Sequence, residues 1–367
     1  MIKQLTLHNF TVFKDADLHF SKGLNVIIGE NGTGKTHLLK LGYLFSHAHH
    51  GLIKNKSIVS DAKVEHYFSE RLQNLFKPDK IGSLTSVDSD GKSNVSALVT
   101  GSIPTVTIQM PNESQTPHLS DETKWDFSFS NSSVDNVNVV LQERLTSNAS
   151  YGKGIYLPSK EMISFFEGFL AAYENREFQF DETYRDLALN LSANKLKNPP
   201  KFIEQDLKTV GDDVGGKLKL EGGKFYLLSP TSELREVTLV AEGIRKIATL
   251  LHLLENGSLE VGDTLFWDEP ESNLNPKLIK DVAAGLLSLC QHGIQVVIGT
   301  HSLFLLREIE ILTGLEPFNS TPQRYFALEK NDTSVIVQQG NTLDDIQTLI
   351  VLDESLMQSD RYLAMEE

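Results

Sequence analysis

Eight consecutive residues near the start of the chain have the types and spacing that bind phosphate. Gly29 to Thr36 has the sequence Gly-Glu-Asn-Gly-Thr-Gly-Lys-Thr, a full match to G-x-x-x-x-G-K-[ST]. Glycines let backbone N–H groups point at phosphate oxygens, and the N-terminus of the following helix adds partial positive charge. The ammonium of Lys35 would reach the terminal phosphates and the hydroxyl of Thr36 would ligate Mg²⁺. We therefore expect ATP to be bound by Asn31, Gly32, Thr33, Gly34, Lys35 and Thr36.

A second group of residues supplies carboxylates. The apolar run Thr264–Trp267 predicts a strand, and Asp268 and Glu269 follow it directly. The carboxyl ends of strands are the edge at which α/β sheets bind phosphates. Asp268 suits Mg²⁺, and Glu269 could activate the attacking water as a general base. A plain Gly-rich turn and a plain acidic strand end are the alternatives, and the presence of both motifs in one chain disfavours them.

Composition limits the class of protein. The chain has 367 residues, a formal net charge of −15 and 40% hydrophobic residues, which is ordinary for a globular protein. The single cysteine, Cys290, excludes an internal disulfide and a cysteine-ligated zinc cluster. No apolar run is long enough to span a membrane, and residues 1–10 alternate like a strand rather than a signal peptide. We expect a cytoplasmic protein with no membrane partner.

Strands that alternate with helices must position these residues. Strands are predicted at Ile2–Leu7, Ala16–Phe20, Leu24–Ile28, Val95–Thr100, Thr105–Met110, Ile155–Leu157, Thr264–Trp267, Ile294–Ile298, Arg324–Leu328 and Ser334–Gln338. Helices are predicted across Leu38–Phe45, Val64–Phe76, Met162–Tyr173, Val240–Leu254, Pro276–Leu289 and from Leu343 onward. Gly222-Gly223 predicts a hairpin, and Pro111–Asn136 is interpreted as a polar link. This order predicts an α/β fold with a mostly parallel core sheet and helices on both faces.

The chain divides into a core and two inserted parts. We expect the core at 1–48 and 237–367, an inserted α+β lobe with polar loops at 49–154, and a helical and hairpin lid subdomain at 155–236.

These motifs resemble the P-loop NTPases of ABC type, in particular the SMC/RecF/OLD-like ATPases, AAA-type proteins of the kind found in bacterial anti-phage defence. Asn9-Phe10 and Gly23-Leu24-Asn25 precede the phosphate loop as they do in that family. Ser272–Pro276 is similar to its D-loop, with Asn273 and Asn275, and Gly299–Ser302 is similar to its switch histidine motif. The resemblance implies that His301 contacts the γ-phosphate and is catalytic together with Glu269. It also implies ATP and Mg²⁺ as cofactors, with Thr36 and Asp268 as the metal residues.

A signature motif, which would contact the ATP of a second protomer, is expected before the acidic strand. Val240–Arg245 is similar to it, with Ala241, Glu242, Gly243 and Arg245 as the expected contacts. Ala241 replaces the serine of the family pattern, so backbone N–H groups would donate instead. The family's bridging glutamine is not identified, and Gln109 and Gln142 are the candidates.

Two roles of different classes follow from the resemblance. The first is an ATPase switch that forms a homodimer, or an assembly of dimers, around ATP and controls a separate effector such as a nuclease or toxin. The 66 residues after His301 are too few for an OLD-type nuclease domain, so the effector is expected on another chain. The alternative is a DNA-binding repair or SMC-like clamp, for which Lys195, Lys197, Lys201 and Lys217 are candidate contacts. A transporter ATPase is a third, weaker reading.

Overall fold

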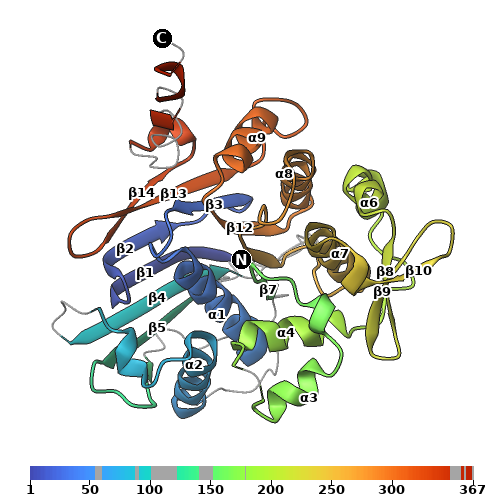
Figure 1. Ribbon diagram of the computed structural model, residues 1–367. Coiled ribbons are helices and arrows are strands. Elements are labelled where there is room, and N and C mark those ends of the chain that lie inside the picture. The colour runs from blue at the N-terminus through green and yellow to red at the C-terminus, as the bar shows by residue number, and fades with distance from the viewer. Residues whose placement is uncertain are drawn as a thin grey trace, which may run out of the picture.

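The computed structural model describes residues 1–53, 60–86, 91–100, 122–139, 152–177 and 179–347, together with 357–358 and 361–365. Figure 1 shows helix α1 (Lys35–Ile53) near the centre of the molecule, with strands of one sheet on its left and the helices α7, α8 and α9 on the far side of the core strands. The layers are therefore sheet, helix, sheet and helices. No helix in the described ranges is both long enough and apolar enough to cross a bilayer.

Six strands form the core sheet in the order β14-β13-β3-β12-β11-β7. Their bounds are β3 Leu24–Gly29, β7 Gly154–Leu157, β11 Thr264–Asp268, β12 Gln295–Thr300, β13 Gln323–Lys330 and β14 Val335–Gly340. Every neighbouring pair is parallel except β13 and β14. Strands β3, β11 and β12 are buried along their whole length, which explains their near-continuous apolar sequences. The mostly parallel α/β sheet predicted from the sequence is confirmed.

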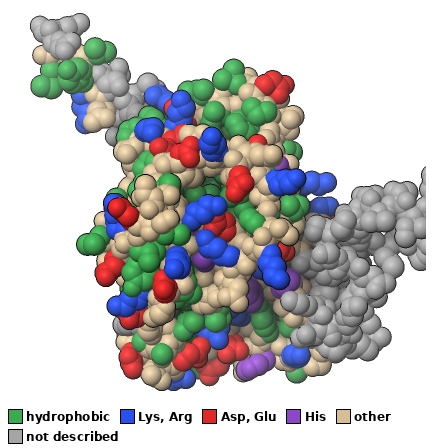
Figure 2. Space-filling view, turned by 90° about the vertical axis from the view of Figure 1, so that its right-hand side faces the viewer, with side chains coloured by type: hydrophobic (Ala, Val, Ile, Leu, Met, Phe, Trp, Pro, Cys, Tyr) green, Lys and Arg blue, Asp and Glu red, His purple; other side chains and the backbone are tan. Residues whose placement is uncertain are grey.

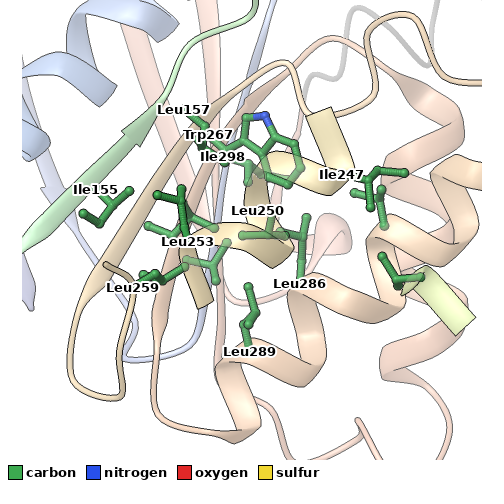
Figure 3. Close-up of a cluster of buried hydrophobic side chains, with 14 of the residues drawn as sticks. Ile155, Leu157, Ile247, Leu250, Leu253, Leu259, Trp267, Leu286, Leu289 and Ile298 are labelled. Carbon is green, nitrogen blue, oxygen red and sulfur yellow. The ribbon is translucent and has the colours of Figure 1, made fainter. Parts of the chain in front are cut away.

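Alternate residues of β3 face two hydrophobic clusters. Val26 and Ile28 lie in the cluster formed with α7, α8 and α9, whereas Ile27 lies in the cluster formed with α1. The helices of the first cluster are α7 (Glu242–Glu255), α8 (Pro276–Gln291) and α9 (Leu303–Thr313). Figure 3 shows leucines of α7 and α8 pointing toward Trp267 of β11 and Ile298 of β12. Helices therefore cover both faces of the core sheet, as predicted.

A second, antiparallel sheet packs on the other side of α1. Its order is β2-β1-β4-β5-β6, with β1 Ile2–Phe10, β2 Phe13–His19, β4 Lys92–Thr100, β5 Glu122–Ser130 and β6 Asn138–Val139. Helix α2 (Asp61–Phe76) also packs into the hydrophobic cluster around α1, through Val64, Phe68, Leu72 and Leu75. Phe45 of α1 stacks on Phe127 of β5, with 5.5 Å between ring centroids.

Two expectations for the 49–154 segment are corrected. Strand β4 pairs along β1, so the described part of this segment extends the sheet of the first strands instead of forming a separate lobe. The second half of the predicted polar link Pro111–Asn136 contains β5, in which Trp125, Phe127 and Phe129 are buried and alternate with polar residues. The Ser and Asp residues between them made the segment look like a loop. The predicted strand Thr105–Met110 lies outside the described residues.

The 155–236 segment forms short helices and a hairpin beside α7. The elements are α3 Phe169–Glu174, α4 Glu182–Leu191, α5 Phe202–Gln205, α6 Lys208–Val214, β8 Lys217–Glu221, β9 Lys224–Leu228 and β10 Leu234–Glu236. The predicted hairpin is confirmed, with φ of 59° at Gly222 and 80° at Gly223. The predicted helix Met162–Tyr173 is wrong because Gly168, with φ 71°, separates a short 3₁₀ turn from α3. Where a helix was expected from Leu343, the chain forms a 3₁₀ turn, Leu343–Asp345, and the described residues 357–358 and 361–363 are helical.

Buried charges join α1, α2 and α4. Arg71 of α2 lies 3.0 Å from the carboxylate of Glu182 and 2.8 Å from that of Asp186, both in α4, and its side chain is 6% exposed. The hydroxyl of Tyr43, in α1, donates to Asp186 at 2.5 Å. Lys40, on the same helix as Tyr43, forms an ion pair of 2.8 Å with Asp181. These contacts connect α1, the helix that follows the phosphate loop, to the lid subdomain.

Replacing Arg71 with methionine should lower the free energy of unfolding by about 3 kcal/mol or more, because two buried carboxylates lose their cation. Urea denaturation followed by circular dichroism measures this. Lys219→Met is the matched control, since Lys219 pairs with Glu221 at 2.8 Å on the exposed hairpin and such pairs contribute little. Equal changes in the two variants would show that the buried network stabilises no more than a surface pair.

Candidate nucleotide-binding site

The phosphate loop connects the carboxyl end of β3 to α1. Gly32 and Gly34 have φ of 78° and 93°, in the left-handed region that side chains rarely adopt. A Cβ on Gly34 would lie 2.7 Å from the Phe13 ring, so the loop approaches β2 too closely for any side chain there. The hydroxyl of Thr33 donates to the Glu30 carbonyl at 2.9 Å. These contacts give the loop the wrapped conformation that the sequence predicted.

Lys35 folds back onto this loop. Its Nζ donates to the carbonyl of Gly29 at 2.7 Å and to that of Glu30 at 2.9 Å. Burial lowers the pKa of Lys35, while the carboxylates of Glu269 and Asp268 act in the opposite direction. The ammonium therefore lies at the loop with its hydrogen bonds made to carbonyl oxygens that phosphate oxygens could replace.

The two predicted metal residues are in direct contact. Thr36 Oγ1 donates to Asp268 Oδ2 at 2.7 Å. Burial raises the pKa of Asp268, and the Thr36 hydrogen bond partly offsets this. A divalent cation would stabilise the ionised form of such a carboxylate. The described residues contain no group of three or more His, Cys, Asp or Glu side chains that could enclose a metal. One hydroxyl and one carboxylate fit Mg²⁺, which usually keeps water and phosphate oxygens as its other ligands.

Glu269 and His301 also meet at this edge of the sheet. His301 Nδ1 lies 3.4 Å from Glu269 Oε1, and the Glu269 N–H donates to the Gly299 carbonyl at 2.9 Å. Glu269 has φ 50°, a left-handed conformation that is unusual for a residue with a side chain. His301 is half exposed, so one side of the pair remains open to a ligand. The structure brings together both predicted catalytic residues.

Glu271 is a site residue that the sequence analysis missed. Its Oε1 accepts from Thr300 Oγ1 at 2.6 Å, and the same hydroxyl accepts from the Ser302 N–H at 2.9 Å. Burial raises the pKa of Glu271. The hydrogen bond between Glu271 and Thr300 therefore connects the loop that follows β11 to the loop that contains His301. The sequence did contain a signal for this residue, because Glu271 is the third acidic residue in the segment that starts at Asp268.

The two D-loop asparagines have different local roles. Asn273 has φ 64°, which turns the chain sharply after β11. Asn275 is the N-cap of α8, where its Oδ1 accepts from the Leu278 N–H at 3.0 Å. Neither conformation excludes a contact with a second protomer.

The signature-like residues begin α7. Ala241 is exposed, stands at the N-cap position and provides no side-chain cap, so the first N–H groups of α7 lack this partner. Glu242 follows in the first turn, and Gly243 is buried. A Cβ on Gly243 would lie 2.6 Å from the Asn273 carbonyl oxygen and 2.4 Å from Leu274. Gly243 is thus required for the close approach of α7 to the D-loop of its own chain, a requirement that the sequence analysis did not anticipate.

Arg245, the last of the signature-like residues, forms an ion pair within its own chain. Its Nε donates to Glu161 Oε1 at 2.7 Å, a second guanidinium nitrogen lies 2.6 Å from the same oxygen, and a third donates to the Val240 carbonyl. The charge of Arg245 is compensated by a buried carboxylate within the chain. The pairing arises because Glu161 and the first turn of α7 lie together, although 84 residues separate them.

Lys246 connects the same helix to the acidic loop. Its Nζ lies 3.4 Å from the Glu269 carbonyl oxygen and 3.3 Å from that of Ser272. Burial lowers the pKa of Lys246, although carboxylates that include Glu242 and Glu271 oppose this. The candidate bridging glutamines, Gln109 and Gln142, lie outside the described residues.

Comparison with protein families identifies a match over most of the chain. The family described as "AAA domain, putative AbiEii toxin, Type IV TA system" matches residues 24–307. A second family, described as an AAA domain, matches residues 4–41.

Curated relatives match over short segments. A DNA replication and repair protein RecF from Limosilactobacillus reuteri is 41% identical over 46 residues, which are 12% of this chain and 12% of the relative. The RecF of Streptococcus uberis is 32% identical over 87 residues, or 24% of this chain and 22% of the relative. The matches thus span less than a quarter of the relatives' length.

Solved structures match over nearly the whole chain. The SMC head bound to the C-winged helix domain of ScpA has a TM-score of 0.54 at 14% identity and covers 93% of this chain and 97% of that chain. The SMC head domain with a coiled coil and joint from Pyrococcus yayanosii has a TM-score of 0.54 at 9% identity, with 96% and 99% covered. At these identities the likeness shows the fold, which is that of an SMC head.

The phosphate loop, the acidic strand end and the histidine loop are thus assembled on an SMC-head fold, and a family match extends from β3 into α9. The chain belongs to this AAA domain family, has the fold of an SMC head, and is similar to RecF proteins over short segments.

Proposed function

We propose that this protein is a cytoplasmic switch that binds and hydrolyses ATP with Mg²⁺, forms a homodimer around ATP, and controls a separate effector protein. One observation carries the proposal: the Thr36–Asp268 contact of 2.7 Å and the His301–Glu269 contact of 3.4 Å lie at the same strand ends as the phosphate loop. Phosphate binding, metal binding and proton transfer would need residues in that arrangement.

Each residue has a defined task in hydrolysis. Lys35 would exchange its carbonyl partners for the β- and γ-phosphates, and Thr36 and Asp268 would hold Mg²⁺. The metal would neutralise charge on the phosphates. Glu269 would accept a proton from the attacking water, and His301 would orient the γ-phosphate end of the substrate.

The start of α7 supports dimerisation. The helix is 14 residues long, and its first N–H groups receive no side-chain cap from Ala241. A helix N-terminus of this kind binds anions. In the described part of the chain, none of Ala241, Glu242, Gly243 and Arg245 forms a hydrogen bond with the phosphate loop. We therefore propose that α7 contacts the ATP of a second protomer.

Control of an effector rests on the comparisons. The family description names a toxin of a toxin–antitoxin system, and one SMC head structure is that of a complex with a domain of ScpA. By analogy, we propose that the nucleotide state of this chain is passed to a nuclease or toxin on another chain, in anti-phage defence.

A DNA clamp is the second candidate, because the RecF relatives are named for DNA replication and repair. The charges on the lid face weigh against it. Lys195 pairs with Glu255 at 2.6 Å, and Lys217 pairs with the same carboxylate at 3.2 Å. Figure 2 shows Lys and Arg side chains interspersed with Asp and Glu on the face that contains the lid subdomain. Two of the four candidate lysines are therefore compensated, and compensated cations provide little attraction for a phosphate backbone.

The ATP-dimer mechanism is tested with Glu269→Gln. The amide keeps the shape of the side chain but cannot act as a base, so ATP should bind and remain uncleaved. We expect the variant to form a stable dimer in ATP and Mg²⁺ but not in ADP. Multi-angle light scattering coupled to size-exclusion chromatography measures the mass.

A second substitution at Ala241 tests the α7 contact. Ala241→Asp in the Glu269→Gln background should abolish the ATP dimer, because its carboxylate would cap α7 and repel the phosphate of the second protomer. Ala241→Asn caps the same helix without charge and should retain the dimer. Gly243 is unsuitable for this test, since any side chain there meets Asn273. An ATP-independent mass for Glu269→Gln would contradict the mechanism.

The DNA alternative has its own measurement. Fluorescence anisotropy of a labelled duplex, titrated with the Glu269→Gln protein at about 0.15 M salt, should show no increase in affinity when ATP and Mg²⁺ are added. An ATP-dependent gain of tenfold or more that weakens steeply with salt would favour the clamp over the effector switch.

A further inference from the structure

A second lysine lies at the phosphate loop, contributed by a strand about 300 residues later in the chain. We propose that Lys330 binds the terminal phosphate of ATP and gives the site its preference for ATP over ADP. This inference rests on the proposed function, since it assigns a further binding residue to the same site.

The position of Lys330 follows from the register of the core sheet. Strand β13 runs parallel to β3, with Leu328 opposite Gly29, the first residue of the phosphate loop. Lys330 stands two residues further along, where β13 ends, and its side chain therefore passes over the loop. Its Nζ lies 3.3 Å from the Asn31 carbonyl oxygen. A Cβ on Gly32 would also lie 3.3 Å from this Nζ, so the ammonium directly adjoins the tip of the loop.

Two lysines thereby bind three consecutive carbonyls of one loop. Lys35 takes the carbonyls of Gly29 and Glu30, and Lys330 takes that of Asn31. In loops of this type the helix lysine addresses the β- and γ-phosphates. Lys330 adjoins the same end of the loop, so the terminal phosphates are the part of the nucleotide within its reach.

The hydrogen bond that Lys330 makes is weak and replaceable. At 3.3 Å it lies beyond the usual N–H···O distance, and its acceptor is neutral. Among the described residues, no carboxylate lies within ion-pair distance of Lys330, and its neighbour Glu329 instead accepts from Gln338 at 3.3 Å. An ammonium with three donors gains more from a phosphate oxygen than from a carbonyl, because the bond is then charge-assisted.

Hydrogen bonds hold the turn after Lys330 in one conformation, which limits the conformational entropy lost when the lysine binds phosphate. Asn331 Oδ1 accepts from the N–H groups of Thr333 at 3.1 Å and Ser334 at 2.7 Å. The Val335 N–H donates to the Val12 carbonyl at 2.9 Å, which fixes the turn to the strand pair beneath the phosphate loop. The backbone of the β13–β14 turn that carries Lys330 is therefore held in place.

Lys330→Met tests the proposal, because methionine retains most of the length and loses the charge. Isothermal titration calorimetry with Mg²⁺ would compare Kd for the non-hydrolysable analogue AMP-PNP with Kd for ADP. We expect Kd for AMP-PNP to rise about 5- to 10-fold, and Kd for ADP to change less than about 2-fold. The affinity for AMP-PNP should also depend less steeply on salt in the variant.

Two variants serve as controls. Lys330→Arg should remain close to wild type for both ligands, since it keeps the charge at the same place. Lys14→Met removes the neighbouring lysine, whose Nζ donates to Thr333 Oγ1 at 3.2 Å, and should leave both Kd values unchanged.

Three results would overturn the inference. An equal loss of affinity for both ligands in Lys330→Met would show that the lysine only supports the loop. Unchanged affinity for both would show that it has no part in binding. Wild-type protein that binds neither nucleotide would overturn the proposed function itself, and the inference with it.

Discussion

The parallel register of four strands is the constraint on which the site depends. Asp268 lies opposite Gly299 in the pairing of β11 with β12, and Thr300 lies opposite Ile28 in the pairing of β12 with β3. Leu328 lies opposite Gly29 in the pairing of β13 with β3. The phosphate loop, the acidic loop, the histidine loop and the Lys330 turn therefore leave the sheet at one edge. A shift of one residue in any of these pairings would move each side chain of a strand from one hydrophobic cluster to the other, so the packing of both clusters fixes the site geometry.

Two sets of contacts connect this edge to the rest of the molecule. The helix after the phosphate loop is joined to α4 through Tyr43, Arg71 and Asp186. The helix that begins with the signature-like residues is joined to the acidic loop through Lys246 and through the close approach at Gly243. A displacement of α7 would therefore change the hydrogen bond between Lys246 and the carbonyl oxygen of Glu269. These contacts connect the start of α7 directly to the loop that carries Glu269.

The chemistry of the site could be predicted from the sequence to the extent that it is local. Lys35 and Thr36 belong to one continuous motif, and Asp268 and Glu269 to another, so their spacing along the chain determines their roles. The pairing of Arg245 with Glu161 could not be predicted in this way, because nothing in either segment indicates that they meet. Lys330 was missed for the same reason, since only the register of β13 brings it to the loop. Strand β5 was obscured by polar residues that alternate with its buried aromatic side chains.

Electrostatics explains why the contacts in the site must change when nucleotide binds. The acidic loop places Asp268, Glu269 and Glu271 in a partly buried region, and burial raises the pKa of Asp268 and Glu271. A triphosphate would be repelled from such a region without added positive charge. The cations at the loop are Lys35 and Lys330, and both donate to loop carbonyls, whereas Thr36 donates to Asp268. If the chain binds nucleotide and Mg²⁺ as proposed, the phosphates would replace the carbonyl partners of Lys35 and the metal would replace the hydrogen bond between Thr36 and Asp268. The contacts that stabilise the site without ligand are therefore the ones that the two ligands would replace.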